Sequence, residues 1–457
     1  GSTEHPNSGQ PRHDFMGGNS WITWILASLD PNGPVYDPRN VELLAQGPSV
    51  LTLDLTAGES PTVNGAALKA GSDRALAQLA MAATLKNAKY NALTGTLRFR
   101  IQNNTGHKLI SGFPEGRRIF VNVQAFDADN NLIYEVNPYD ATVGTLKSMP
   151  ASPVLSASEI YLDELVIESH PKSSLTGEQH TFHFVLADGR SKDNRIPPRG
   201  FDYQQAAARI SEPVNPFTHV SDIDYFTPDE YAGGYDDMQI EILPGAARVD
   251  IALYYQGTSR EYVQFLRDEI NGNGSLPSPT PSGEAQAYIV QSDPFFTQLK
   301  AWGDTIWDLW IHNHGLDGTG PLVPGIVPAL MTQTSVTPAP VADIEIEINN
   351  ETPIHPHHDG SPGSPNAIND VIPVSVLTTS IADGDDDDFD ATQVAPLSLR
   401  FGPTGAIDTD GAAAISDYDS DGDADATFQF LTGDAGFICT STTGTLVGET
   451  YAGDPVS

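Results

Sequence analysis

The sequence contains one cysteine, Cys439, among 457 residues. A disulfide within the chain needs two cysteines, so none can form. Every Cys-x-x-Cys motif is excluded for the same reason, including the Cys-x-x-Cys-His motif that attaches haem c. The chain therefore cannot hold a c-type haem covalently.

Basic residues are also scarce. Lys and Arg number 23 against 60 Asp and Glu, which gives a formal net charge of −37. A protein that binds the phosphate backbone needs a basic surface, so no nucleic acid is expected as a partner. So large an acidic excess keeps a protein in solution, can mark a saline habitat and can supply calcium ligands.

Long apolar runs and the motifs of common enzymes are missing. No run of about 18 apolar residues occurs, so the sequence predicts no membrane span. The amino end has no basic segment followed by an apolar core, the pattern of an export signal. Gly-x-Ser-x-Gly, His-Glu-x-x-His and phosphate-loop motifs are absent as well. These absences favour a non-catalytic protein.

The most informative stretch is a glycine-marked loop, residues 103–118, between two runs that alternate apolar and polar residues. Such alternation is typical of half-buried strands. Glycine and proline shape the loop, which presents His107, Lys108, Arg117 and Arg118 at one rim of a sheet. Two interpretations are open: a hairpin loop with solvated charges, or a ligand-facing loop with an imidazole for a metal and guanidiniums for carboxylates.

Seven segments in the first two-thirds of the chain have strand-like composition, with turn residues between them. They are residues 93–103, 118–127, 131–136, 159–167, 180–187, 238–243 and 248–256. This series of short strands predicts a β-sandwich.

Three helices are predicted around these strands. Residues 64–86 form an alanine-rich amphipathic pattern. The capping-box pattern at 258–261 and the Asp293-Pro294 pair each predict a helix start. The aromatic stripe that ends at Trp310 is interpreted as core. Residues 1–60 are expected to be an extended arm.

The composition changes after Met331. We expect a β-sandwich domain with helices over 61–331, a Thr/Pro/Val linker at 332–340 and a separate domain over 341–457. The last of these contains 22 Asp and Glu but one Arg. Its short strands are expected at 343–348, 371–378, 398–401, 426–431 and 444–451. The sequence thus predicts a mainly β chain with a few peripheral helices and a smaller, acidic, all-β calcium-binding domain.

Carboxylates alternate along a loop in this acidic domain, and Gly422 stands at the sixth position of the loop. This pattern matches the first half of a calcium loop of the EF-hand type. Position 12 is Phe428, so the usual bidentate Glu is missing, and the flanks look like strands. We predict a calcium loop between strands; a solvated acidic turn is the alternative. The candidate ligands are Asp417, Asp419, Asp421, Asp423 and Asp425, with Asp408 and Asp410 as closing carboxylates.

Histidines concentrate at His312-Asn313-His314 and at His355-Pro356-His357-His358. Either cluster could bind a transition metal, but no matching ligand set lies nearby in sequence. His13 stands just ahead of a tight glycine turn and, alone, is a loop histidine.

Several ordered segments carry a resemblance to a known family. They read HDFMGGN (13–19), TGHKL (105–109), GFPEGRR (112–118), DNRIPPRGF (193–201) and LYYQGTSREY (253–262). Through them, the first 330 residues resemble the carboxyl-terminal, non-haem region of large secreted bacterial multihaem c-type cytochromes.

The resemblance implies a haem partner, because a haem-bearing segment precedes this region in such proteins. It implies that His13 lies where a distal axial ligand is offered to a haem held by another segment or chain, with His107 as the second candidate. Arg117 and Arg118 are then candidates to pair with haem propionates. The expected cofactors are calcium and haem c held elsewhere.

The acidic domain is similar to a β-rich module at the carboxyl end of many secreted bacterial proteins. The similarity rests on the Asp417 loop and on DIEI (343–346), VIPVSVL (371–377), FDAT (389–392), RFGPTG (400–405) and LVGET (446–450). In that module a cysteine near the position of Cys439 looks paired with one close to the end.

These resemblances imply an extracellular or periplasmic scaffold of a multihaem electron-transfer system, which packs against haem-bearing protein and is stabilised by calcium. The rival interpretation is a haemless structural or adhesive protein that self-assembles. A third is a redox enzyme whose haem lies upstream and whose substrate entrance this region shapes.

Overall fold

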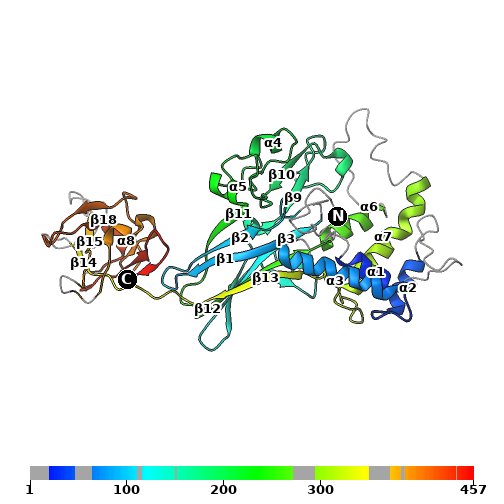
Figure 1. Ribbon diagram of the computed structural model, residues 1–457, viewed down its shortest axis with the longest axis horizontal. Coiled ribbons are helices and arrows are strands. Elements are labelled where there is room, and N and C mark those ends of the chain that lie inside the picture. Colours follow the sequence, from blue (N-terminus) through cyan, green and yellow to red (C-terminus); the bar gives the residue numbers. More distant parts are fainter. Residues whose placement is uncertain are drawn as a thin grey trace, which may run out of the picture.

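The computed structural model describes residues 20–46, 64–110, 116–149, 152–270, 294–348, 371–381, 385, 387–438 and 440–457. They form a mainly β chain with peripheral helices, as the sequence predicts. Figure 1 shows a larger body with long helices at one end and a smaller, strand-rich body that contains the carboxyl end. No helix in the described ranges is long and apolar enough to cross a membrane.

Two sheets form the larger body. One has the strand order β1-β2-β11, and the other has the order β13-β12-β3-β4-β7 with β8 also paired to β3. Neighbouring strands are antiparallel except β4 and β7. The bounds are β1 Ala83–Tyr90, β2 Thr96–Asn103, β3 Arg118–Phe126, β4 Leu132–Val136, β7 Glu159–Ile160, β8 Val166–Ile167, β11 Tyr235–Glu241, β12 Arg248–Gln256 and β13 Ala329–Val336.

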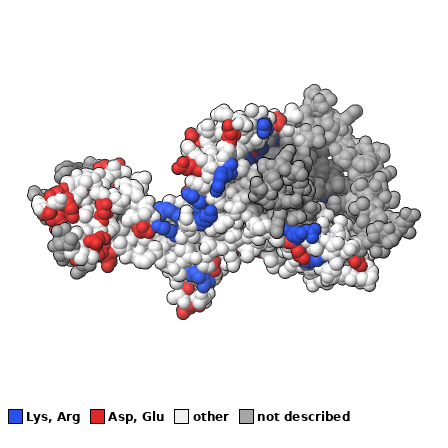
Figure 2. Space-filling view, viewed as in Figure 1, with Lys and Arg blue, Asp and Glu red and all other residues white. Residues whose placement is uncertain are grey.

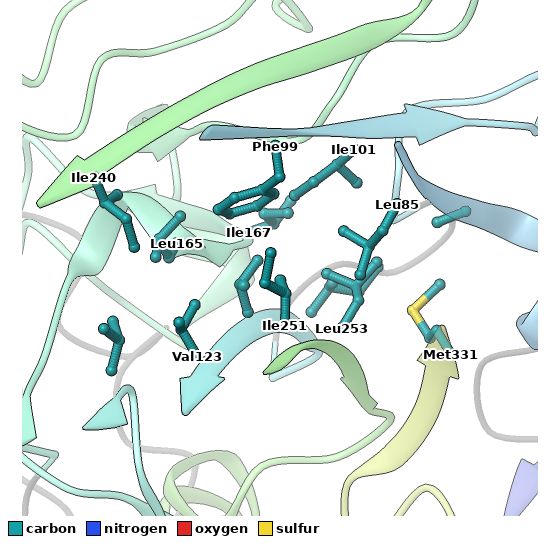
Figure 3. Close-up of a cluster of buried hydrophobic side chains, with 14 of the residues drawn as sticks. Leu85, Phe99, Ile101, Val123, Leu165, Ile167, Ile240, Ile251, Leu253 and Met331 are labelled. Carbon is teal, nitrogen blue, oxygen red and sulfur yellow. The ribbon is translucent and has the colours of Figure 1, made fainter. Parts of the chain in front are cut away.

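Both sheets contribute to one hydrophobic core. In Figure 3, Phe99 and Ile101 of the first sheet face Val123, Ile251 and Leu253 of the second. Ile101, Val123, Ile251 and Leu253 are fully buried. Because strand side chains alternate between two faces, every second residue of β3 and β12 enters this core. Each buried aliphatic side chain contributes about 1.5–3 kcal/mol to folding.

The strand predicted at 180–187 is wrong. This segment contains a short 3-10 helix, Phe184–Leu186, and lies between the paired strands β9 (Ser169–Lys172) and β10 (Gly189–Asp193). Phe182 packs edge-on against Tyr262, with a ring-centroid distance of 5.2 Å. Phe182 and Phe184 are half-buried and contact a helix through Tyr262, so these apolar residues are covered without a strand partner.

Helices build a second core at one end of the larger body. It contains Ile25, Leu43, Val263, Leu309 and Trp310. Trp310 is 2% exposed and Ile306 packs against the same core, so the interpretation of the aromatic stripe as core is confirmed for these two residues. The described part of the arm is not extended, because residues 20–46 contain two helices that join this core. The bounds are α1 Ile22–Ala27, α2 Pro38–Ala45, α3 Gly65–Ala82, α6 Arg260–Ile270 and α7 Pro294–Asn313.

One predicted helix end and one predicted helix cap need correction. The helix predicted over 64–86 ends at Ala82, where β1 begins without a loop because Leu85 pairs with Ile101 of β2. The helix start predicted at 258–261 is confirmed, because α6 begins at Arg260, but the predicted capping box does not form. Instead, Ser259 Oγ accepts the N–H of Tyr262 at 3.3 Å, and Glu261 turns to other partners. The predicted helix start at Pro294 is confirmed.

The smaller body contains two sheets around its own core. Their orders are β14-β15-β18-β17 and β16-β19-β20, and Val374, Phe401, Phe428 and Phe430 are fully buried between them. All five predicted segments contain a strand. The bounds are β14 Ile346–Ile348, β15 Val371–Val376, β16 Arg400–Phe401, β17 Ala414–Ser416, β18 Asp425–Leu431, β19 Leu446–Glu449 and β20 Pro455–Val456, with a short helix α8 at Thr432–Ala435.

The connection between the two bodies is shorter than the predicted linker, because residues 332–336 belong to β13 and pair with β12. Polar contacts also join the bodies directly. Glu449, with a side chain 1% exposed, pairs with Arg98 and accepts from Asn91 Nδ2 at 3.0 Å, and Lys89 meets Asp454 at 2.9 Å. In Figure 2, acidic side chains are spread over the smaller body, and basic ones lie on the larger body or at the junction. Opposite charges therefore meet where the bodies touch.

Short elements complete the larger body. They are β5 (Tyr139–Asp140) paired with β6 (Thr145–Leu146), α4 (Tyr203–Ala207) and α5 (Pro228–Gly233). Thr227 and Glu230 form a reciprocal capping box at the start of α5, and Gly234 ends the helix with φ +67. Glycine suits that end because it adopts positive φ without a Cβ clash.

Candidate functional site

Two segments of the chain that lie far apart in sequence, residues 103–109 and residues 193–201, meet in the fold. Asn103 Nδ2 donates to the carbonyl oxygens of His107 at 2.8 Å, Ile196 at 3.0 Å and Pro197 at 3.1 Å. The N–H of Leu109 donates to the same Ile196 oxygen at 2.8 Å. One buried amide therefore joins the loop after β2 to the segment that follows β10.

The same segments form a buried ion cluster. Asp193 is fully buried and is contacted by Lys108 Nζ at 3.1 Å, by Arg195 at 2.7 Å and by the Arg190 guanidinium. Burial alone would raise the pKa of Asp193, but Arg195 and Lys108 hold it well below its usual range. Burial lowers the pKa of Lys108 to about 8, despite the opposing charge of Asp193. These charges satisfy one another inside the chain, so their role is structural.

His107 lies at the outer edge of this arrangement. Its side chain is exposed, while its carbonyl oxygen accepts from Asn103 Nδ2 and from Thr105 Oγ1 at 2.9 Å. The next residue, Lys108, turns inward to the ion cluster. The loop is therefore held in place from inside, with the imidazole directed outward. His13, the other predicted axial ligand, lies outside the described residues.

The two predicted propionate partners differ in their surroundings. Arg117 is half-buried. Arg118 is 3% exposed, and its guanidinium donates to Gln256 at 2.9 Å and Thr145 at 3.1 Å and lies 3.4 Å from Glu261. This burial does not favour the predicted role of Arg118 with an external carboxylate. Its observed role is to join β3, β12 and α6.

A buried polar network extends from Arg118 through Gln256 and Tyr139 to His314. Gln256 donates from Nε2 to the hydroxyl of Tyr139 at 3.2 Å, and that hydroxyl lies 2.7 Å from Nε2 of His314. Tyr139 and His314 are 175 residues apart. No local spacing could have revealed this contact.

The predicted calcium loop forms a turn between β17 and β18, as expected. Carboxylate oxygens of Asp417, Asp419 and Asp425 lie within 4.8 Å of one another. Gly422 has φ +108, so the sharp turn predicted at the sixth position is present. Asp425 is fully buried and is held by the N–H groups of Thr378 at 2.8 Å and Tyr418 at 2.7 Å.

Charge is poorly compensated in this loop. Asp423 Oδ1 is buried and accepts no hydrogen bond from the described residues. Loss of solvent is the largest of the effects that raise the pKa of Asp423 to about 6, and repulsion from Asp421 is the second. The pKa of Asp419 is raised by the same two effects. Hard carboxylate oxygens in this arrangement suit a calcium ion.

The predicted closing carboxylates do not join the loop in this structure. Asp408 is 5% exposed and uses its oxygens to accept the N–H groups of Gln429 at 2.8 Å and Gly411 at 2.6 Å. Gln429 lies four residues along β18 from Asp425, a separation of roughly 13 Å in a strand. Asp410 is exposed and outside the carboxylate group. Asp421 and Asp423 lie in the same loop, so they, backbone oxygens and water are candidates for further ligands.

His312 and His314, which the sequence offered only as a possible metal-binding cluster, do not form a joint site in the structure. His312 is bonded to Asp37 and Asp317, whereas His314 faces Tyr139, so the two rings have different partners. The His355–His358 cluster lies outside the described residues.

Comparison with known proteins does not identify a family for this chain. No family model matches the sequence, and no curated protein matches it. Among solved structures, a penta-heme cytochrome c552 from Thermochromatium tepidum matches with a TM-score of 0.29 and 13% identity, covering 65% of this chain. The match covers 50% of the cytochrome, so the chain spans about half the length of that protein. At this TM-score the likeness does not establish a shared fold.

Proposed function

We propose that this chain is a non-catalytic scaffold of a secreted multihaem cytochrome system. In this proposal its larger body packs against a haem-bearing segment or chain, and calcium stabilises its acidic domain. The observation that carries the first part is His107, an exposed imidazole on a loop that Asn103 and the Asp193 ion cluster hold in place.

The chemistry of His107 fits this role. A neutral imidazole is a standard ligand of haem iron, and a ligand on a fixed loop loses little entropy when it binds. The iron would supply the electron transfer. This chain would present the ligand and a complementary surface. The resemblance of the segments around His107 to the non-haem cytochrome region supports the same partner.

Replacing His107 by alanine is expected to weaken binding to the haem-bearing segment or chain at least about tenfold, as removal of a group that supports metal binding does. The measurement is the shift of the Soret band when haem protein is titrated with this chain, together with co-elution in size-exclusion chromatography. The control is His219→Asn. His219 is also exposed on the larger body, and asparagine tolerates its φ of +59.

Equal binding by wild type and His107→Ala would remove His107 from the proposal. Absence of any Soret shift or co-elution with wild type would contradict the haem partner itself. Polymerisation of the purified chain without haem protein would instead favour a haemless, self-assembling structural protein.

Calcium is expected to raise the melting temperature of the acidic domain. At a free concentration 100 times the dissociation constant, binding to the native state alone stabilises by about 2.7 kcal/mol, which raises Tm by roughly 10 °C for a domain of this size. Scanning calorimetry with calcium and with chelator measures the shift. The double variant Asp417→Asn, Asp419→Asn is expected to abolish it, because two of the three grouped carboxylates lose their charge.

The control for calcium is Asp434→Asn, an exposed carboxylate of the same domain outside the loop. It is expected to retain the full shift. A shift that survives in the double variant would show that the Asp417 loop is a solvated turn and that calcium binds elsewhere.

A further inference from the structure

A row of closely spaced rings runs through the interior between the second sheet and α7. Trp307 of α7 is half-buried, and the row continues from it into the protein. Centroid distances between successive rings are 6.2 Å for Trp307–Trp310, 4.9 Å for Trp310–His314, 6.0 Å for His314–Tyr139, 6.2 Å for Tyr139–Phe120 and 5.5 Å for Phe120–Tyr254. Neighbouring rings at such distances are in van der Waals range, as in ordinary aromatic packing.

One contact in this row is more than packing. The hydroxyl of Tyr139 lies 2.7 Å from Nε2 of His314. The same oxygen accepts from Gln256 Nε2, which is fixed as a donor because Gln256 Oε1 accepts from Arg118 Nε at 2.9 Å. The Tyr139 O–H is therefore directed at His314, whose Nε2 accepts.

The electrostatics keep this pair neutral at rest. Burial, with the nearby Arg260 guanidinium, lowers the pKa of His314 to about 4. The imidazole is therefore neutral near neutral pH and can accept a proton. Burial also raises the pKa of Tyr139, so the phenol keeps its proton. His314 is 2% exposed, and its Nδ1 is buried without a partner among the described residues.

We propose that Tyr139 and His314 form a redox-active pair in which loss of an electron from the phenol is coupled to proton transfer. The electron passes to a strong one-electron oxidant, of the class of a ferryl haem. The Tyr139 O–H bond breaks and an N–H bond forms at Nε2 of His314, which leaves a neutral tyrosyl radical beside an imidazolium. Return of one electron reverses both changes. The heavy-atom distance lies within the range required for direct proton transfer.

The surroundings determine where the oxidised state is most stable. The guanidiniums of Arg260 and Arg267 lie 5.4 Å and 4.2 Å from the ring centroid of Trp307. Positive charge on that indole is disfavoured by these two cations. Oxidation of Tyr139 instead leaves a neutral phenoxyl ring, and the positive charge is carried by the imidazolium of His314.

The inference can be tested on the isolated chain without a haem protein. Its outcome is therefore independent of the proposed function. Flash oxidation with a photogenerated ruthenium(III) polypyridyl complex, followed by electron paramagnetic resonance, is expected to show a tyrosyl radical. Its formation is expected to slow in D₂O. Tyr139→Phe should lose this radical, and His314→Gln should lose it or form it more slowly, because glutamine can accept the hydrogen bond but not the proton.

The matched control is Tyr254→Phe. Tyr254 is half-buried in the same row, 5.5 Å from Phe120, but no histidine among the described residues is hydrogen-bonded to its hydroxyl. This variant should give the wild-type signal. A wild-type radical with an unchanged rate in Tyr139→Phe would overturn the proposal. The same result in His314→Gln would overturn the role of His314 as proton acceptor.

Discussion

Replacing Asp193 by asparagine is expected to lower the free energy of unfolding of the larger body by about 3–5 kcal/mol, the cost of breaking a buried ion pair by removing one partner. Asp193 is fully buried, and Lys108, Arg190 and Arg195 all contact its carboxylate. Asparagine has nearly the same shape but no charge. The variant would leave three cations in a nearly dry environment with too little negative charge.

The same carboxylate sets an expected pH dependence. Arg195 and Lys108 hold the pKa of Asp193 below its unfolded value of about 3.9. A depressed folded-state pKa means that the unfolded state binds the proton more readily. The contribution of Asp193 is therefore fully present above pH ~4 and is lost as the pH falls further.

Urea unfolding followed by tryptophan fluorescence measures this effect in the larger body alone, since all five tryptophans precede residue 331. Asp237→Asn is the matched control. Asp237 also receives two hydrogen bonds from one arginine, Arg100, both at 2.6 Å, but its side chain is 52% exposed. Exposed ion pairs contribute about 0–1 kcal/mol. A similar loss in both variants would mean that burial does not determine the strength of the Asp193 cluster.

Sequence periodicity predicted the central strands well but predicted the ends of helices and strands poorly. β12 has the predicted bounds, Arg248–Gln256, because a strand with one face in the core must alternate. The switch from helix to strand at Ala83 was missed. Alanine-rich sequence favours a helix locally, and pairing with β2 overrides that preference.

The geometry of a candidate site could be predicted from the sequence only where the contacts are local. The Asp417 loop closes over nine residues, so its carboxylate spacing and its glycine could be read directly from the sequence. Lys108 and Asp193 are 85 residues apart, and nothing in their spacing marks them as partners. The segments around them were singled out by an expected resemblance, but the fold was needed to show that their charges face inward.

The imidazole of His312 shows the same dependence on long-range contacts. Its Nε2 lies 2.8 Å from Asp37 at the start of α2, and its Nδ1 lies 2.6 Å from Asp317 after α7. Only a protonated imidazole can donate on both sides. Burial lowers the pKa of His312, but the hydrogen bonds to Asp317 and Asp37 outweigh burial and raise it. His312 therefore fastens α2 to the end of α7.

His312→Ala is expected to lower the free energy of unfolding by about 2–4 kcal/mol below the unfolded histidine pKa of ~6.5, because two charge-assisted hydrogen bonds are lost. Folding raises the pKa of His312. Its contribution is therefore fully present at low pH and is lost as the pH rises through the folded-state pKa. The difference between wild type and variant should therefore shrink toward alkaline pH, opposite in direction to the Asp193 effect. Tryptophan fluorescence in urea measures it, with exposed His107→Ala as the control. A difference that stays constant with pH would mean that folding does not shift the pKa of His312, and that its two carboxylate neighbours do not stabilise the charged imidazole.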